Sequence, residues 1–182
     1  MTQTFDLSLS IPRSEINQDE RRFKVEASEA ELSGLAERFK IVSIAFLSAD
    51  ISVSTARDRD AIIVSGHVSA KLKQKCIVSL APVDEIIDED FELNLVEPEI
   101  ANQFDEDEVY LDPDAPDYDA LEGEQVALGE IVAQTLSVMM DPYPRAADAE
   151  LQDVPNGSVS VNAELEKKPN PFAVLSKLND ES

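Results

Sequence analysis

Residues 61–73 read Ala-Ile-Ile-Val-Ser-Gly-His-Val-Ser-Ala-Lys-Leu-Lys, and apolar side chains alternate with polar ones along this stretch. Successive side chains of a β-strand point to opposite faces of its sheet, so a period of two predicts a strand with one apolar face and one polar face. The apolar face carries Ile62, Val64, Gly66, Val68, Ala70 and Leu72, and the polar face carries Ser65, His67, Ser69 and Lys71. The stretch predicts a long strand with one buried face and one solvent-exposed face.

The same alternation appears in the stretches before and after this strand. In residues 41–55 one face carries Leu47, Ala49, Ile51 and Val53, and in residues 83–96 one face carries Phe91, Leu93 and Leu95. The connections are short, and short connections between alternating strands are typical of an antiparallel meander. Residues 3–11 also alternate and end at Pro12, so we expect them to extend the sheet as an N-terminal strand.

Two stretches change to the helical period and supply the cover for the apolar face. Ser28 and Glu31 form a capping box at the start of an expected helix over 29–39. A second helix is expected over 128–140, and it ends at the two prolines of residues 141–145. The patterns predict an α+β fold: an antiparallel β-sheet meander packed by two amphipathic helices, with an acidic loop and a C-terminal linker plus short helix.

The expected organisation is one α+β domain over residues 1–145, followed by two appendages. Within the domain, residues 97–125 are acidic and rich in proline, which predicts an extended or partly disordered loop. Residues 146–168 contain few apolar side chains and are expected to form a flexible linker. Residues 169–182 are expected to hold a short amphipathic helix.

The net charge of −23 is concentrated in one segment. Residues 76–144 contain 20 Asp or Glu and no Lys, Arg or His, whereas residues 1–75 are neutral overall. Such a segment repels nucleic acid and anionic membranes, so we expect no direct nucleic-acid binding through 76–144 and no membrane binding. Three interpretations stay open: a solvated face that keeps the protein soluble, a docking surface for a basic partner, or a site for a divalent metal ion. The candidate contacts in the loop are Asp105, Glu106, Asp107 and Glu108.

The sequence predicts no catalytic, cofactor or metal site. His67 is the only histidine and is expected on the polar face of its strand, and Cys76 is the only cysteine and has no identifiable base beside it. The acidic run lacks the glycine that a calcium loop needs at its sixth position, and Pro113 and Pro116 block the tight wrap. Residues 1–6 lack the basic and apolar regions of a secretory signal, and no apolar stretch reaches about 18 residues. A lone cysteine fits a reducing compartment, so we expect a cytoplasmic protein without a secretory signal.

The tail offers a second candidate contact. Asn170 is a good N-cap and Pro171 suits the first helical position, so a helix is expected over 170–178. Its apolar stripe comprises Phe172, Leu175 and Leu178. A helix of this length is not stable alone in water, so the stripe is expected to dock on its own domain or on a partner.

Three stretches of the chain resemble the YceD family of large-subunit ribosomal RNA accumulation proteins. The most specific is Lys168-Pro-Asn-Pro-Phe-Ala-Val-Leu-Ser-Lys-Leu178, which is similar to the family's C-terminal signature. The segment 76–83 resembles the central hairpin of the family, and 125–132 followed by 141–144 resembles its helix and Pro-x-Pro exit. The acidic insert at 112–116 resembles the alphaproteobacterial branch.

One position departs from the family pattern. Many members carry Cys-x-x-Cys at the hairpin, which suggests a zinc knuckle, whereas this chain has Cys76 and Ser79. A single thiolate without a nearby histidine cannot complete a tetrahedral site, so no zinc is expected here.

The resemblance implies a non-catalytic role in the accumulation, processing or stability of large-subunit (23S) ribosomal RNA. A protein of this charge is expected to reach ribosomal precursors through a basic protein, such as a ribosomal protein or an assembly factor. The alternative is an acidic chaperone or adaptor without a ribosomal link.

Overall fold

The structure is a computed structural model of the 182-residue chain, and it describes residues 4–57, 61–101, 117–147 and 149. The chain divides into two compact units, residues 1–150 and residues 151–182, and all described residues belong to the first. The predicted short helix of 169–182 lies outside the described residues, as does the predicted linker apart from 146, 147 and 149.

The first unit is built on a six-stranded sheet in the order β1-β3-β4-β5-β6-β7. Its long central strands are β4 (Ser43–Thr55), β5 (Ala61–Lys75) and β6 (Pro82–Val96). All three run antiparallel to their neighbours within this group, and β5 pairs with β6 from Ala61 opposite Val96 to Lys75 opposite Pro82. The predicted α+β fold and its three central strands are confirmed.

The prediction of one N-terminal strand over residues 3–11 is wrong. The stretch forms two short strands, β1 (Thr4–Phe5), which pairs with β3, and β2 (Ile11–Pro12), which pairs with β8. The break has a local cause, because the carboxylate of Asp6 accepts hydrogen bonds from the amide and the hydroxyl of Ser8. The amide of Leu7 donates to Glu31 Oε1 at 2.9 Å. These bonds to side chains replace the backbone hydrogen bonds that would continue the strand pairing.

The long N-terminal strand is β3 (Arg21–Glu26), which the charged character of residues 21–24 concealed. It pairs antiparallel with β4, and its Phe23 and Val25 are buried while Arg22 and Glu26 are exposed. The alternation is present but short. A 3₁₀ turn, η1 (Arg13–Glu15), lies between β2 and β3.

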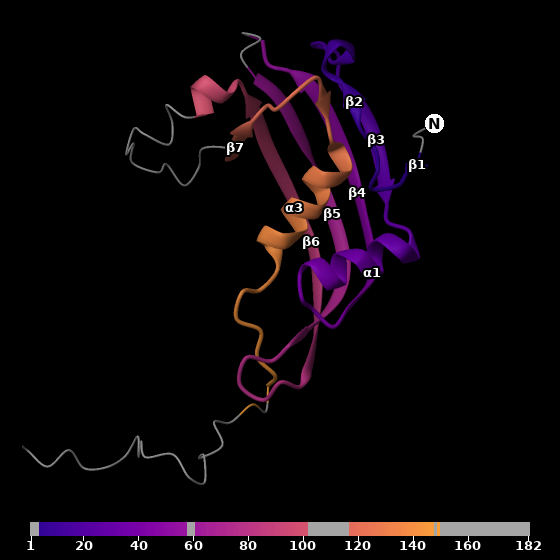
Figure 1. The fold of residues 1–182 in the computed structure, drawn as a ribbon, viewed down its shortest axis with the longest axis vertical. Coiled ribbons are helices and arrows are strands. Elements are labelled where there is room, and N and C mark those ends of the chain that lie inside the picture. The colour runs from indigo at the N-terminus through magenta and orange to yellow at the C-terminus, as the bar shows by residue number, and fades with distance from the viewer. Residues whose placement is uncertain (1–3, 58–60, 102–116, 148, 150–182) are drawn as a thin grey trace, which may run out of the picture. The chain divides into compact units, whose positions relative to one another are not determined.

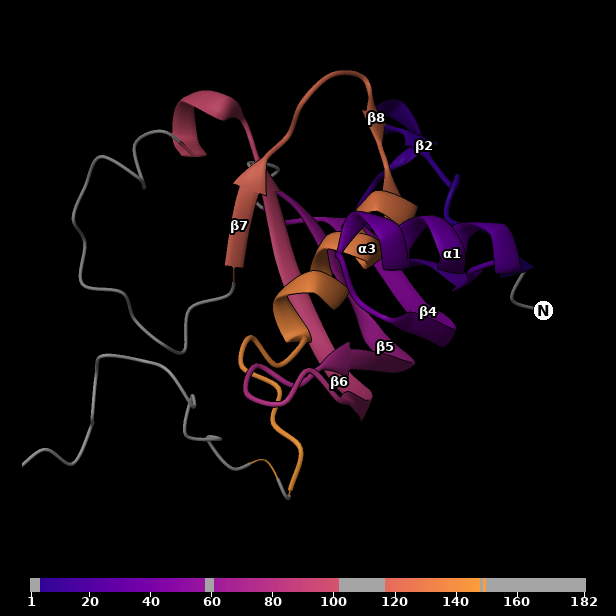
Figure 2. The same ribbon diagram turned by 60° about the horizontal axis from the view of Figure 1, so that its bottom comes forward.

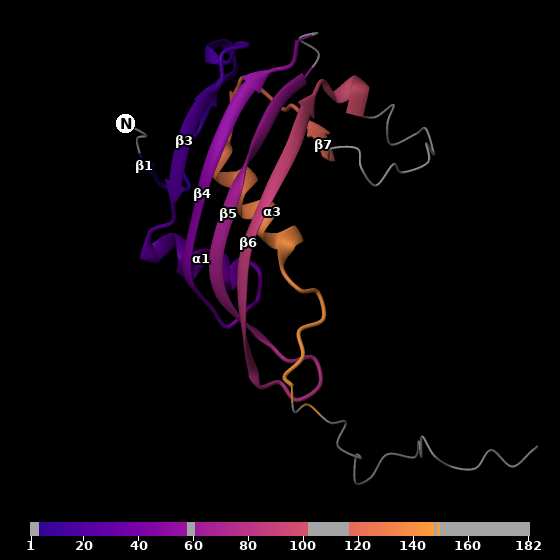
Figure 3. The ribbon, with the colours of Figure 1, turned by 180° about the vertical axis from the view of Figure 1, so that it is seen from behind.

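Two helices cover one face of the sheet, as a comparison of Figures 1 and 3 shows. α1 (Glu29–Arg38) begins with the predicted capping box, in which Ser28 and Glu31 bond each other reciprocally. α3 (Leu128–Met139) buries Leu128, Val132 and Leu136 completely. Both predicted helices are confirmed, and the opposite face of the sheet carries no helix among the described residues. Within the described residues, no helix is both long enough and apolar enough to cross a membrane.

The predicted acidic loop of 97–125 is ordered at both of its described ends. Residues 98–101 are helical, β7 (Asp117–Ala120) pairs parallel with Leu93–Val96 of β6, and β8 (Gln125–Val126) pairs with β2. Figure 2 shows β7 beside one end of β6. Leu121 is buried, and its amide donates to the carbonyl oxygen of Val96 at 2.6 Å. Composition alone concealed these short pairings, because each strand is only two to four residues long and too short to show an alternating pattern.

Candidate functional site

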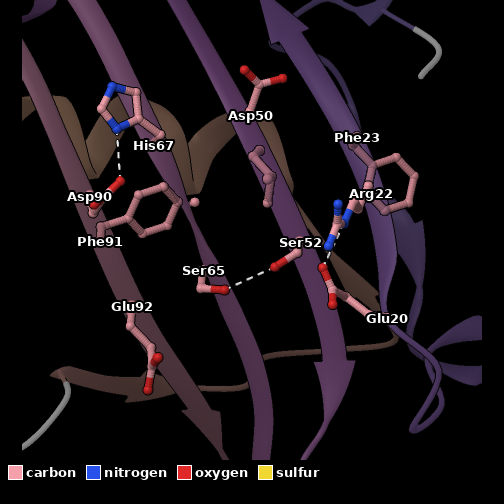
Figure 4. A pocket seen from close by; sticks show the side chains of 12 residues that line it. Glu20, Arg22, Phe23, Asp50, Ser52, Ser65, His67, Asp90, Phe91 and Glu92 are labelled. Atoms are coloured by element: carbon pink, nitrogen blue, oxygen red, sulfur yellow. Dashed lines mark hydrogen bonds and ion pairs between the residues drawn. The ribbon is translucent and has the colours of Figure 1, made fainter. Parts of the chain in front are cut away.

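The helix-free face of the sheet carries rows of polar side chains because strand register brings the polar positions together. One row joins Ser52, Ser65 and Glu92 across β4, β5 and β6, and the next joins Asp50, His67 and Asp90. These rows line a hollow of about 790 Å³, shown in Figure 4. The hollow is open, and the rings of Phe23 and Phe91 line it together with the polar side chains.

The polar groups in this hollow are largely bonded to one another. The hydroxyls of Ser52 and Ser65 lie 2.9 Å apart, and Arg22 Nε donates to a carboxylate oxygen of Glu20 at 2.7 Å. Arg22 and Glu20 therefore compensate each other's charge at the β3 side of the hollow.

His67 lies between two carboxylates of β6. Its Nε2 is 2.9 Å from Asp88 Oδ1 and its Nδ1 is 2.7 Å from Asp90 Oδ1, while the hydroxyl of Ser69 also donates to Asp88. Asp88 first, and then Asp90, raise the pKa of His67 above its usual 6.5, because both stabilise the imidazolium. The sequence placed His67 on the polar face correctly, but only the strand register reveals its partners.

We expect the single histidine resonance to titrate above pH 6.5 in the folded protein. Because the folded pKa is raised, the stabilisation from this pairing is complete below pH 6.5 and is lost as the pH rises through the folded pKa. Asp88→Asn should bring the midpoint of the His67 titration back toward 6.5. The side chain of Asp84 pairs with Lys73 instead, so Asp84→Asn should leave this midpoint unchanged. An NMR titration of the imidazole carbon-bound protons measures this, and a wild-type midpoint at or below 6.5 would contradict the geometry.

Acidic side chains gather at the β6–β7 side of the sheet. We call this set the acidic edge, and it comprises Asp84, Asp88, Glu89, Asp90, Glu92, Asp117 and Asp119, all exposed. Lys73 of β5 lies 2.6 Å from Asp84 and compensates part of the charge. No ion pair involves Glu89, Glu92, Asp117 or Asp119 within the described part of the chain, so their charge faces outward.

The turn between β5 and β6 forms a second cluster of polar contacts, around Cys76. The cysteine is fully buried, and its Sγ accepts hydrogen bonds from the amides of Val78, Ser79 and Ala146, each at 3.4 Å. The residues after α3 lie along this turn, since the amide of Ile77 donates to the carbonyl oxygen of Pro144 at 2.9 Å. Bonds from Ser79 and then Ala146 lower the pKa of Cys76 to about 6.

This environment makes the effect of Cys76→Ser dependent on pH. The folded pKa is lowered, so the thiolate's stabilisation is complete above the pKa of an unfolded cysteine and is lost as the pH falls through about 6. The difference in unfolding free energy between wild type and Cys76→Ser should therefore grow from pH 6 to about pH 8.5 and then level off. Urea unfolding of both proteins across this range measures it, and a difference that does not change with pH would refute the lowered pKa.

None of the predicted contact residues belongs to the part of the chain that the structure describes. Asp105, Glu106, Asp107 and Glu108 lie outside the described residues, and so do Asn170, Pro171, Phe172, Leu175 and Leu178. Other acidic residues of 76–144 do come together, as the acidic edge. No group of three or more His, Cys, Asp or Glu side chains in the described ranges is arranged to hold a metal ion.

Comparison with known proteins gives one family. No curated protein and no solved structure shows a significant match to the chain. The model of the family described as large ribosomal RNA subunit accumulation protein YceD matches residues 64–179, well over half of the sequence. The matched stretch contains β6, β7, β8 and α3, and it covers the whole of the acidic segment 76–144. The chain therefore belongs to the YceD family.

Proposed function

We propose that this protein promotes the accumulation of large-subunit (23S) ribosomal RNA as a non-catalytic factor that binds a basic protein through the acidic edge. The family match carries the ribosomal part of the proposal, because the family's description supports a ribosome-related role. The acidic edge supports the mode of action, since exposed carboxylates of one sign favour a cationic partner.

A protein partner is favoured over direct RNA contact on charge grounds. RNA affinity depends on Lys and Arg side chains that neutralise phosphates. The acidic edge presents carboxylates instead, and Lys73, one of the cationic side chains next to it, is paired with Asp84. Ribosomal precursors also contain proteins rich in basic residues, which offer the opposite charge.

A second candidate is an acidic chaperone or adaptor without a ribosomal link. The segment of 20 acidic and no basic residues favours this second candidate, because attraction by charge alone would allow the protein to bind many different cationic proteins. The two candidates differ in where the protein is found in the cell, so fractionation separates them.

Sedimentation of cell lysate through a gradient at low salt tests the proposal. The protein should migrate with large-subunit precursors, and cells lacking it should contain less 23S relative to 16S ribosomal RNA. A protein that stays at the top of the gradient, in cells whose 23S to 16S ratio is unaffected by its loss, would favour the adaptor.

A further inference from the structure

Within the part of the chain that the structure describes, most of β6 has a neighbouring strand on one side only. All of its residues from Pro82 to Val96 pair with β5, but β7 pairs only with Leu93–Val96. No backbone–backbone hydrogen bond from any other described segment reaches residues 82–92, although the amide of Asp141 donates to the side chain of Glu85 at 2.8 Å. Figure 3 shows β6 at the side of the sheet, with β7 beside one end of it. A strand of this kind presents a row of backbone donors and acceptors that can pair with another chain.

The side chains along this unpaired stretch set the chemistry of what can pair there. On the open face they are Asp84, Ile86, Asp88, Asp90 and Glu92, in that order at alternate positions. Ile86 is 72% exposed, and Phe46, on the other side of Lys71 in the same row, is 46% exposed. A strand added beside β6 would place alternate side chains next to these, because cross-strand neighbours lie about 4.5–5.5 Å apart.

We propose that residues 82–92 of β6 bind an extended, basic segment of a partner protein by adding it to the sheet as a further strand. Its alternate residues are Lys or Arg beside the carboxylates and one apolar residue beside Ile86. Backbone pairing gives this contact its affinity, and the alternating side chains give it specificity. This inference takes one premise from the proposed function, namely that the partner protein is basic.

The charges argue against a second copy of this chain at the same edge. Antiparallel pairing of two β6 strands would bring the carboxylates of residues 84–92 in both copies against each other. Like charges directly opposite each other destabilise a strand pair. Pairing with a cationic strand is favourable instead, because each carboxylate of β6 then lies beside a side chain of opposite charge.

Amide exchange in the free full-length protein gives the first test. In an antiparallel pair, alternate amides of β6 bond to β5 and the others point away. We expect alternate amides of residues 83–91 to exchange slowly and those between them to exchange fast. Slow exchange at every position in the free protein would overturn the proposal, because another part of this chain or a second copy would already cover the edge.

A peptide probe gives the second test. A capped nine-residue peptide that alternates lysine and valine, with leucine in place of the lysine that would lie beside Ile86, should slow the fast amides of 83–91. The matched control has N-methyl groups on two adjacent central residues, which removes one backbone donor from each edge of the peptide and leaves its charge unchanged. The control should bind at least about tenfold more weakly.

The outcomes separate this inference from the proposed function. Equal binding of both peptides, weakened by salt, would overturn strand addition and leave a basic partner at the acidic edge intact. Failure of both peptides to change the exchange of residues 83–91 would overturn strand addition as well. Only selective protection by the unmethylated peptide supports it.

Discussion

Replacing Gly66 by alanine should lower the free energy of unfolding by about 3 kcal/mol or more, at the upper end of the cost of overpacking. A β-carbon at Gly66 would overlap the backbone carbonyl oxygen of Asp50 and would lie 3.1 Å from Cα of Ile51. It would also lie 3.1 Å from the ring of Phe91, opposite Gly66 on β6. The clash is with the backbone of a central strand, which cannot move without disturbing β4. Urea unfolding followed by circular dichroism measures the loss.

Gly34→Ala is the matched control for this substitution. A β-carbon at Gly34 meets nothing within 4 Å, and the residue lies inside α1. Alanine is the better helix former by about 0.5–1 kcal/mol, so this variant should be slightly more stable than wild type. Equal stabilities for the two variants would show that β4 and β5 do not approach as closely at Gly66 as the structure places them.

The double variant Glu89→Lys, Glu92→Lys should slow association with large-subunit precursors by about tenfold, because electrostatic steering acts mainly on the association rate. Both carboxylates belong to the acidic edge and both are exposed. The two reversals replace attraction to a basic partner by repulsion. Surface plasmon resonance with immobilised precursors, isolated from cells that lack the protein, measures the rate.

The control for this variant is Glu29→Lys, Glu37→Lys on α1. These two residues are also exposed, and their reversal changes the net charge by the same amount. α1 packs against β4 on the helix-covered face, away from β6 and β7 (Figures 1 and 3). If both double variants slow association equally, net charge rather than the acidic edge governs binding, and the assigned site is wrong.

Periodicity predicted the parts of the fold in which burial decides the structure. Val64 and Val68 are completely buried, and Leu35 and Leu136 anchor the two helices, so the apolar pattern and the fold agree. The sequence-based prediction failed where hydrogen bonds of polar groups determine the structure. The carboxylate of Asp6 ends the strand that its neighbours predicted, and β7 is held by pairing to the backbone of β6.

The candidate site was predictable in composition but not in arrangement. The uneven charge distribution identified an acidic surface, and the family signature in residues 168–178 was visible in the sequence. The partners of the carboxylates were not visible, because His67 and Lys73 meet Asp88 and Asp84 only through the register of β5 with β6. The unpaired length of β6 likewise depends on where β7 joins the sheet.

The association rate of the wild-type protein with purified large-subunit precursors, measured against ionic strength, tests the central claim most directly. Exposed charges are screened beyond a Debye length of about 8–10 Å, so raising the salt from about 50 to about 300 mM should slow association and weaken binding. The salt dependence should be smaller for Glu89→Lys, Glu92→Lys than for the α1 control. An affinity that stays constant across this range would contradict the claim and would leave the acidic edge as a surface that only keeps the protein soluble.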